Sequence, residues 1–413
     1  MRNRALVFFA LLLLAVPTIA KIGTIDVVPA ATLLYPWFEV DTTNPNGVNT
    51  LLTLQNASAT AILAHVTLWT DYGIPTATFN VYLTGYDVET IDLYAVLQRV
   101  PPRTASAGQD PADTVSPHGQ LSQDINFASC TGLLPDVQDS LLAPQLIAAH
   151  RGQEASDYFG GAGVCGGHNY GDGRARGFVT IDTVNNCTLR KPGAVGYFIN
   201  GGGGDATNQN VMLGDYVILD RPNDRVFADN AVHIEAAPGA GGTVSYPPDP
   251  LTAVGAYTFY SRFAASGGHD NREPLPTAWA GRYSVSRTTI GYWRDPGVKA
   301  VPFACGSAPP FAPIDQRQIR AFGADGNAVA VNAGARFPRV SGATPASGAS
   351  GLGLTSALGW TFLNLNLPAN VVQQSWIWFR HVPPAAAVNA PAGYSVPGIQ
   401  LGNTAYGDNP TLP

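Results

Sequence analysis

Charged side chains are scarce in this chain. Only 13% of its 413 residues are Asp, Glu, Lys or Arg, which is about half the usual share for a soluble globular protein. The formal net charge is -6, Lys21, Lys191 and Lys299 are the only lysines, and no run of Lys or Arg occurs. Nucleic acids and anionic membrane surfaces bind to clustered cations. The sequence therefore argues against both as partners.

Long apolar runs are absent beyond the N-terminus. The apolar residues 5–16 follow the basic Arg2 and Arg4 and precede a small-x-small cleavage pattern at residues 18–20. This pattern predicts a signal peptide over residues 1–20, with a mature chain that starts at Lys21. A membrane-spanning helix needs roughly 20 apolar residues, so a retained N-terminal anchor is the disfavoured alternative. We expect an exported protein of the periplasm, cell surface or extracellular space, without a transmembrane segment after cleavage.

The chain has only 4 cysteines: Cys130, Cys165, Cys187 and Cys305. In an exported protein they are expected to form two disulfides, and three connectivities are open. The short loop between Cys165 and Cys187 favours that pair, which leaves Cys130 with Cys305. No C-x-x-C or paired Cys/His spacing occurs, so a zinc site is a weak alternative.

Glycine and proline, by contrast, are abundant, at 45 and 33 residues, and neither suits helix interiors. Residues 49–93 alternate between apolar and polar side chains in four short runs, and turn residues separate the runs. A period of two is typical of strands in antiparallel sheets. Four such strands predict a β-sandwich of immunoglobulin-like type. Pro36 confines the apolar run at residues 31–40 to a sheet edge or a bulge.

The stretch LLYPWFEVDTTNPNGVNTLLTLQNASATAILAHVTLWTDYGIPTATFNVYLTGYDVETIDL adds a resemblance. It is similar to the N-terminal module of a family of uncharacterised secreted bacterial β-rich proteins. These proteins share a P-[YF]-[FY] element, a T-L-[IL]-x-[VL]-x-N strand and turn, and an L-[ST]-x-x-D-V strand start. This chain has Pro36-Trp37-Phe38 at the first element. The resemblance implies export and a β-rich fold, and it brings no activity or catalytic residue.

The sequence predicts an all-β protein of two packed β-sandwich (immunoglobulin-like) modules with long irregular loops and one short helix. Residues 21–100 form the first module, and residues 156–382 form the larger second one. Between them, residues 101–155 are a linker with a short amphipathic helix at residues 136–151, broken by Pro144. Residues 383–413 form a Pro/Ala/Gly-rich tail. Asp325-Gly326-Asn327 predicts a hairpin turn in the second module.

Motifs for catalysis or cofactor binding are missing. The chain has no G-x-S-x-G elbow, no G-x-x-x-x-G-K-[ST] loop and no complete calcium loop. Aspartates in loops, such as Asp172 and Asp325, keep Ca²⁺ open as a ligand, and no other cofactor is expected. His233 and Glu235 share one strand face and are a weak candidate pair. Any site is expected between Cys130 and Cys305.

Aromatic residues are the remaining functional signal. Trp376 and Trp378 share one face of a predicted strand, and exposed aromatic faces stack on sugar rings or flat partners. Burial in a sandwich core is the simpler interpretation, since tryptophan is highly buried on average. The sequence favours an exported, non-enzymatic structural or binding protein with a glycan or envelope protein as partner. A carbohydrate-binding or carbohydrate-active protein, and a subunit of a surface assembly, are the alternatives.

Overall fold

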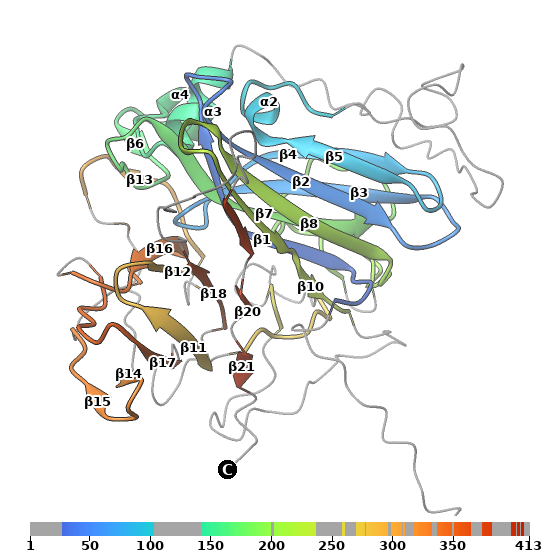
Figure 1. The fold of residues 1–413 in the computed structure, drawn as a ribbon. Helices are drawn as coiled ribbons and strands as arrows, with labels where there is room; N and C mark the ends of the chain where they lie inside the picture. The colour runs from blue at the N-terminus through green and yellow to red at the C-terminus, as the bar shows by residue number, and fades with distance from the viewer. Residues whose placement is uncertain are drawn as a thin grey trace, which may run out of the picture.

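The computed structural model describes residues 27–102, 142–199, 202–236, 258–260, 270–276, 278–295, 299–307, 309, 318–332, 337–348, 351–364, 374–381, 398–401, 403–404 and 406–408. These residues form four larger sheets, antiparallel except for one parallel edge strand, and one two-stranded ribbon, with three short α-helices (Figure 1). The predicted all-β fold is confirmed. The predicted signal peptide, Cys130 and most of the predicted linker lie outside the described residues.

Two five-stranded sheets make up one half of the molecule. Sheet 1 has the order β10 (Val232–Ile234), β1 (Thr32–Asp41), β7 (Arg174–Val184), β3 (Ile62–Thr70) and β4 (Pro75–Leu83). Sheet 2 has the order β19 (Gly398–Leu401), β9 (Arg225–Asn230), β8 (Met212–Asp220), β2 (Val48–Asn56) and β5 (Val88–Asp92). The Tyr35 hydroxyl of β1 donates to the Thr53 carbonyl of β2 at 2.6 Å, and the Tyr35 ring meets the edge of Tyr216 on β8. The two sheets therefore pack against each other.

Strand pairing crosses the boundary that we predict at residue 100. β7 lies between β1 and β3, and β8 pairs with β2 over nine residue positions from Val48 to Asn56. Residues 32–92 and 174–234 thus belong to the same two sheets, and a cut at residue 100 does not separate them. Within the predicted tail, β19 extends sheet 2 as a parallel edge strand.

Strand β3 lies between β7 and β4 in sheet 1 and is buried over its whole length. One of its faces carries Leu63, His65, Thr67 and Trp69, a mixed set of side chains from which the sequence predicts a half-wet face. His65 and Trp69 are 0% and 1% exposed. The cover comes from a segment distant in sequence: the His65 ring packs against Tyr197, and Asn80 on β4 donates to the Thr188 carbonyl at 3.1 Å. The expected half-wet face was wrong because loop residues 185–198 cover it.

Pro36 lies in β1, where the strand register shifts between Tyr35 and Phe38. Proline lacks the N–H that a ladder needs, so a bulge accommodates it. The sequence expectation of an edge or a bulge is confirmed as a bulge. β1 pairs with β7 on one side, and with the three-residue β10 on the other.

Two smaller sheets make up the other half. Sheet 3 has the order β15 (Ala328–Val329), β14 (Gln318–Gly323), β17 (Leu358–Asn364), β11 (Ala278–Ser284) and β21 (Tyr406–Asp408). Sheet 4 has the order β16 (Ser341–Pro345), β12 (Thr288–Arg294), β18 (Ser375–His381) and β20 (Asn403–Thr404). The rings of Trp279 in sheet 3 and Trp376 in sheet 4 meet edge-on at 4.9 Å. Gly326 has a φ of +78°, and it closes the predicted β14–β15 hairpin.

The two halves share one hydrophobic core. Trp69 of β3 stacks on Phe178 of β7, and Phe178 meets the edge of Trp293 on β12 at 6.0 Å. At the same joint, the Ser341 hydroxyl of β16 donates to the Pro36 carbonyl at 2.5 Å. The ribbon of β6 (Val164–Cys165) and β13 (Phe303–Ala304) also connects the halves.

The helices are short and peripheral: α2 (Leu93–Leu97), α3 (Ala143–His150) and α4 (Ser156–Phe159), with a 3₁₀ turn at Arg221–Asn223. Pro144 occupies the first turn of α3, where a missing N–H costs nothing. The helix therefore begins at the proline that we expect to break it. Asp92 ends β5 and caps α2, because its carboxylate accepts from the Tyr94 and Ala95 N–H groups.

Candidate functional site

The tryptophan pair predicted from the sequence is not at the surface. Trp376 and Trp378 are 8% and 4% exposed and belong to the buried hydrophobic core. Gly291 on β12 lies opposite Trp378, and a Cβ at Gly291 would meet the indole at 1.9 Å. Neither ring can stack on a ligand, so their candidacy as a ligand surface was wrong.

His233 and Glu235 form no shared open face either. His233 lies on β10, is 1% exposed, and accepts the Gly214 N–H at Nε2 from 3.1 Å. Burial lowers the pKa of His233 to about 4, so the ring is neutral at physiological pH. Glu235 follows the end of β10 and is half-buried. The histidine is a packed core residue.

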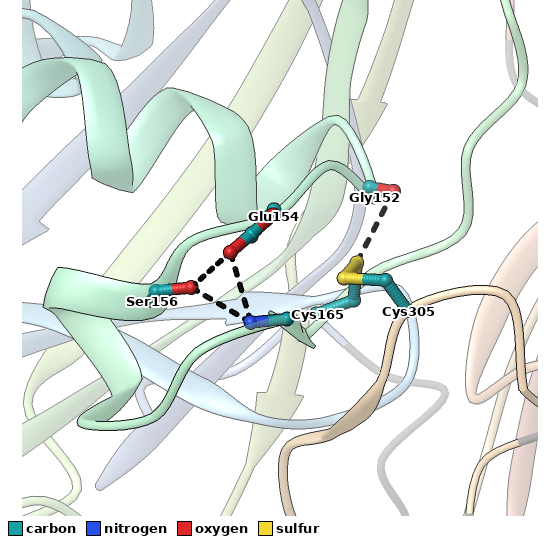
Figure 2. The surroundings of a disulfide bond; sticks show 6 residues. Gly152, Glu154, Ser156, Cys165 and Cys305 are labelled. Carbon is teal, nitrogen blue, oxygen red and sulfur yellow. Dashed lines mark hydrogen bonds between the residues drawn. A yellow bond between two sulfur atoms is a disulfide. The ribbon is translucent and has the colours of Figure 1, made fainter.

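The disulfide that the structure describes joins Cys165 to Cys305 across 140 residues (Figure 2). The predicted pairings of Cys165 with Cys187 and of Cys130 with Cys305 were therefore both wrong. β6 pairs with β13, and the Cys305 N–H donates to the Gly163 carbonyl at 2.8 Å, so the backbone brings the two cysteines together. Cys187 is also disulfide-bonded, and the structure describes no free cysteine.

Next to this disulfide, the carboxylate of Glu154 accepts hydrogen bonds from the Ser156 hydroxyl at 2.5 Å and the Gly163 N–H at 2.8 Å (Figure 2). These two bonds lower the pKa of Glu154. They tie α4 to the loop that enters β6. These hydrogen bonds fix the loop. They also favour the ionised carboxylate of Glu154, which has no proton to donate.

A buried polar network surrounds Asp182 of β7. Its fully buried carboxylate accepts from the hydroxyl groups of Thr32, Tyr197 and Tyr260 at 2.5, 2.8 and 3.0 Å. Arg272 Nη2 lies 3.8 Å away, and its guanidinium also donates to Thr207 and Asp270 carbonyls. The network connects segments up to 240 residues apart. Its polar atoms are occupied by one another, so it acts as a structural cross-link.

A second buried acid, Asp71, lies at the joint of the two halves. Its carboxylate accepts from the His168 N–H at 2.9 Å and the Tyr170 hydroxyl at 3.1 Å, and Arg339 Nε lies 3.7 Å away. Its carbonyl accepts the Ser341 N–H. Burial raises the pKa of Asp71 to about 6, although Arg339 and the two hydrogen bonds lower it. This cluster fastens β16 to the β3–β4 turn.

The outer face of sheet 3 has a different character. Trp360, Leu358 and Phe322 are 48%, 57% and 39% exposed, which is unusual for large apolar side chains on neighbouring strands. Trp360 on β17 pairs in register with Arg282 on β11 and with Phe322 on β14. The Arg282 guanidinium lies over the Trp360 ring, 5.2 Å from its centroid. We name this surface the Trp360 face; it comprises Arg282, Phe322, Leu358 and Trp360.

A hollow of about 460 Å³ opens beside this face, lined by Arg282, Tyr283, Ser284, Ala324, Leu358, Gly359 and Trp360. Sites for small molecules have volumes of roughly 300–1,000 Å³. A second hollow of about 560 Å³ is lined by Arg190 and Asp205, which pair with each other at 3.1 Å. Only the first of these two hollows offers an exposed aromatic ring beside a cation that no acid neutralises.

Exposed arginines without an ion pair lie on and beside this face. Across the described part of the chain, five arginines form ion pairs: Arg174, Arg176, Arg190, Arg272 and Arg339. Five exposed arginines form none there: Arg282 and Arg320 on sheet 3, Arg287 in the turn after β11, and Arg221 and Arg225 between β8 and the start of β9. The Trp360 face therefore presents aromatic surface together with free positive charge.

The described residues contain no group of three or more His, Cys, Asp or Glu side chains placed to hold a metal ion. Nor does any helix in the described ranges combine the length and apolarity needed to cross a membrane. Comparisons with protein-family models, curated proteins and solved structures give no match for this chain.

The alternation of large apolar residues in the sequence predicts an aromatic face on β17, but the same pattern occurs on other strands. Leu358, Trp360 and Phe362 alternate along β17 in the same way as Trp376 and Trp378 alternate along β18. Which alternating row faces solvent depends on the packing of sheet 3 on sheet 4. Leu358 and Trp360 also lie beyond Cys305, outside the region where we expect a site.

Proposed function

We propose that this chain is an exported, non-enzymatic binding protein that uses the Trp360 face to contact its partner. The observation that carries the proposal is the exposed Trp360 ring, with Arg282 over it and a hollow beside it. Tryptophan and arginine are the residue types that contribute most to binding energy at interfaces. The rest of the described chain serves as the scaffold that holds this sheet.

Export is supported by three features. The N-terminal residues 1–20 have the pattern of a signal peptide, and the quoted N-terminal motifs resemble secreted bacterial proteins. Disulfide bonds persist in oxidising compartments and are rare in the cytosol, and the chain has one between Cys165 and Cys305. These features do not separate periplasm, cell surface and extracellular space.

A non-enzymatic role is supported by the bonding of the buried acids. Asp182 and Asp71 are buried carboxylates, and each one accepts hydrogen bonds that join distant segments. A catalytic acid or base must instead reach a substrate through a cleft. The charged residue that lines the hollow of the Trp360 face is Arg282.

Carbohydrate binding is the form of this function that the hollow favours. The C–H face of a pyranose ring is apolar, and it packs on the negatively charged face of an aromatic ring. Trp360 offers such a face at the surface, whereas Trp376 and Trp378 do not. A surface-assembly subunit is the competing form, in which the Trp360 face would contact a protein.

Binding of the full exported chain to soluble and insoluble polysaccharides and to envelope protein extracts tests the proposal. Trp360→Ala should weaken the binding of its partner roughly 10- to 30-fold, the usual effect of removing a central aromatic anchor. Val88→Ala is the matched control, because Val88 is 51% exposed on a strand of sheet 2. Equal binding by wild type and Trp360→Ala to every partner found would refute the role of this face.

A further inference from the structure

We propose that the Trp360 face binds an acidic polysaccharide, a chain of sugar rings that carry carboxylates. The inference rests on the proposed binding function of this face and names its ligand class. One ring packs on Trp360 in the hollow, and its carboxylate pairs with Arg282. Arg320 and Arg287 meet carboxylates further along the chain.

The first argument is charge. The whole chain has a net charge of -6 and would repel a polyanion, so an anionic ligand requires a local positive surface. Arg282, Arg287 and Arg320 supply three positive charges that no acid pairs with in the described residues. Asp325 in the adjoining hairpin is the opposing charge, and Asn327 donates to its carboxylate from both the backbone N–H and the side chain. Positive charge therefore predominates.

The second argument is spacing. Arg282 lies on β11 beside Trp360, whereas Arg320 lies on β14 beside Phe362, one row along the same sheet face. Two strand spacings and two residues of rise place the two arginine Cα atoms about 12 Å apart. A chain of several sugar rings can place one carboxylate near each of these two arginines. Trp360 and Phe362 on β17, the strand between β11 and β14, lie between them in the sheet register.

The third argument concerns the guanidinium group itself. Arginine presents a planar fork of donors that matches a carboxylate in a bidentate pair, and it stacks on aromatic rings. The Arg282 guanidinium already lies over the Trp360 ring at 5.2 Å, so the ring orients it without consuming its donors. A neutral glycan would leave this positive charge without a counterpart.

Other occupants fit less well. A second copy of the chain in a two-fold contact would place the same arginines against one another. A nucleic acid is bound through a stripe of many cations, whereas the Trp360 face and its surroundings offer three arginines, Arg282, Arg287 and Arg320, and no described lysine. An acidic glycan satisfies both the rings and the charges.

Affinity electrophoresis and calorimetry with polygalacturonate and with its carboxyl-reduced form test the proposal, since the two polymers differ only in the charged group. The full exported chain should bind polygalacturonate at least tenfold more tightly than the reduced polymer. Arg282→Gln should lower this ratio, replacement of Arg282, Arg287 and Arg320 together by Gln should bring it close to one, and Trp360→Ala should weaken binding to both polymers. Arg225→Gln, an exposed arginine on β9 in sheet 2, is the control and should change neither.

Equal binding to both polymers, lost in Trp360→Ala, would overturn the acidic ligand and leave the binding function intact. Binding to single-stranded DNA or to an envelope protein in place of polygalacturonate, again through Trp360, would do the same. A folded wild-type chain with no Trp360-dependent binding to any partner would overturn both proposals. Near-ultraviolet circular dichroism of each variant confirms that the fold is retained.

Discussion

Asp71 offers a direct test of the joint between the two halves. Its carboxylate is 1% exposed, and burial raises its pKa from 3.8 to about 6. A protonated Asp71 is therefore favoured in the folded protein over the pH range between these two values. The contribution of protonated Asp71 to the unfolding free energy is fully present below pH 4, and it is lost as the pH rises through about 6. A difference of about two pKa units corresponds to roughly 3 kcal/mol.

The substitution Asp71→Asn removes this titration and keeps a carbonyl oxygen that can accept the His168 N–H. The difference in unfolding free energy between variant and wild type should therefore shift by roughly 3 kcal/mol in favour of the variant between pH 4 and pH 7. Urea denaturation at intervals of half a pH unit measures this difference.

Other groups titrate in the same pH range, and comparing the variant with wild type at each pH cancels their contributions to the unfolding free energy. Burial raises the pKa of Asp229 to about 6 and lowers that of His150 to about 4, with opposite effects on stability as the pH changes. Both groups are present in wild type and variant. Parallel stability curves for the two proteins from pH 4 to pH 7 would refute the raised pKa of Asp71.

Three further substitutions test the structural features. Asp182→Ala leaves Arg272 without its carboxylate and three hydroxyl groups without an acceptor. We expect the unfolding free energy measured by urea denaturation to fall by roughly 5 kcal/mol. The control Arg190→Gln, whose side chain is 53% exposed, should lower it by under about 1 kcal/mol. Gly291→Ala drives a Cβ into the Trp378 ring at 1.9 Å and should lower the unfolding free energy by more than about 3 kcal/mol. In Gly326→Ala the added Cβ meets open space, and the φ of +78° alone should lower it by about 1 kcal/mol. Replacing Cys165 and Cys305 together by Ser releases a loop of 140 residues, and the thermal midpoint in calorimetry should fall, with up to about 5 kcal/mol lost on the loop-entropy model. Wild-type stability in Asp182→Ala, in Gly291→Ala or in the double cysteine variant would contradict the corresponding contact.

Local patterns in the sequence predict individual strands well. The alternation from Ile62 to Thr70, bounded by turn residues, gives β3 with the same bounds that the structure has. Pro36 likewise predicts the bulge in β1. Both features are determined by residues within a few positions of each other, where side-chain direction and backbone constraints act directly.

Features determined by distant residues could not be predicted in the same way. Loop length favours pairing Cys165 with the nearby Cys187, but the β6–β13 ribbon brings Cys305 to Cys165. The face of β3 with His65 looks half-wet in sequence, and Tyr197 covers it. The exposure of Trp360 rather than Trp376 depends on which faces of sheets 3 and 4 meet, and alternation alone is the same for both.

The distribution of charge links the fold to the proposed function. Buried ionic groups such as Asp182 and Arg272 bond to segments far apart in sequence, so a chain with few charges uses them as cross-links. Arg282 makes no such bond among the described residues and is exposed. Exposed side chains of this kind change unfolding free energy by less than about 0.5 kcal/mol when replaced. Stability therefore does not account for an arginine held over an exposed tryptophan, whereas the proposed binding of an anionic ring would.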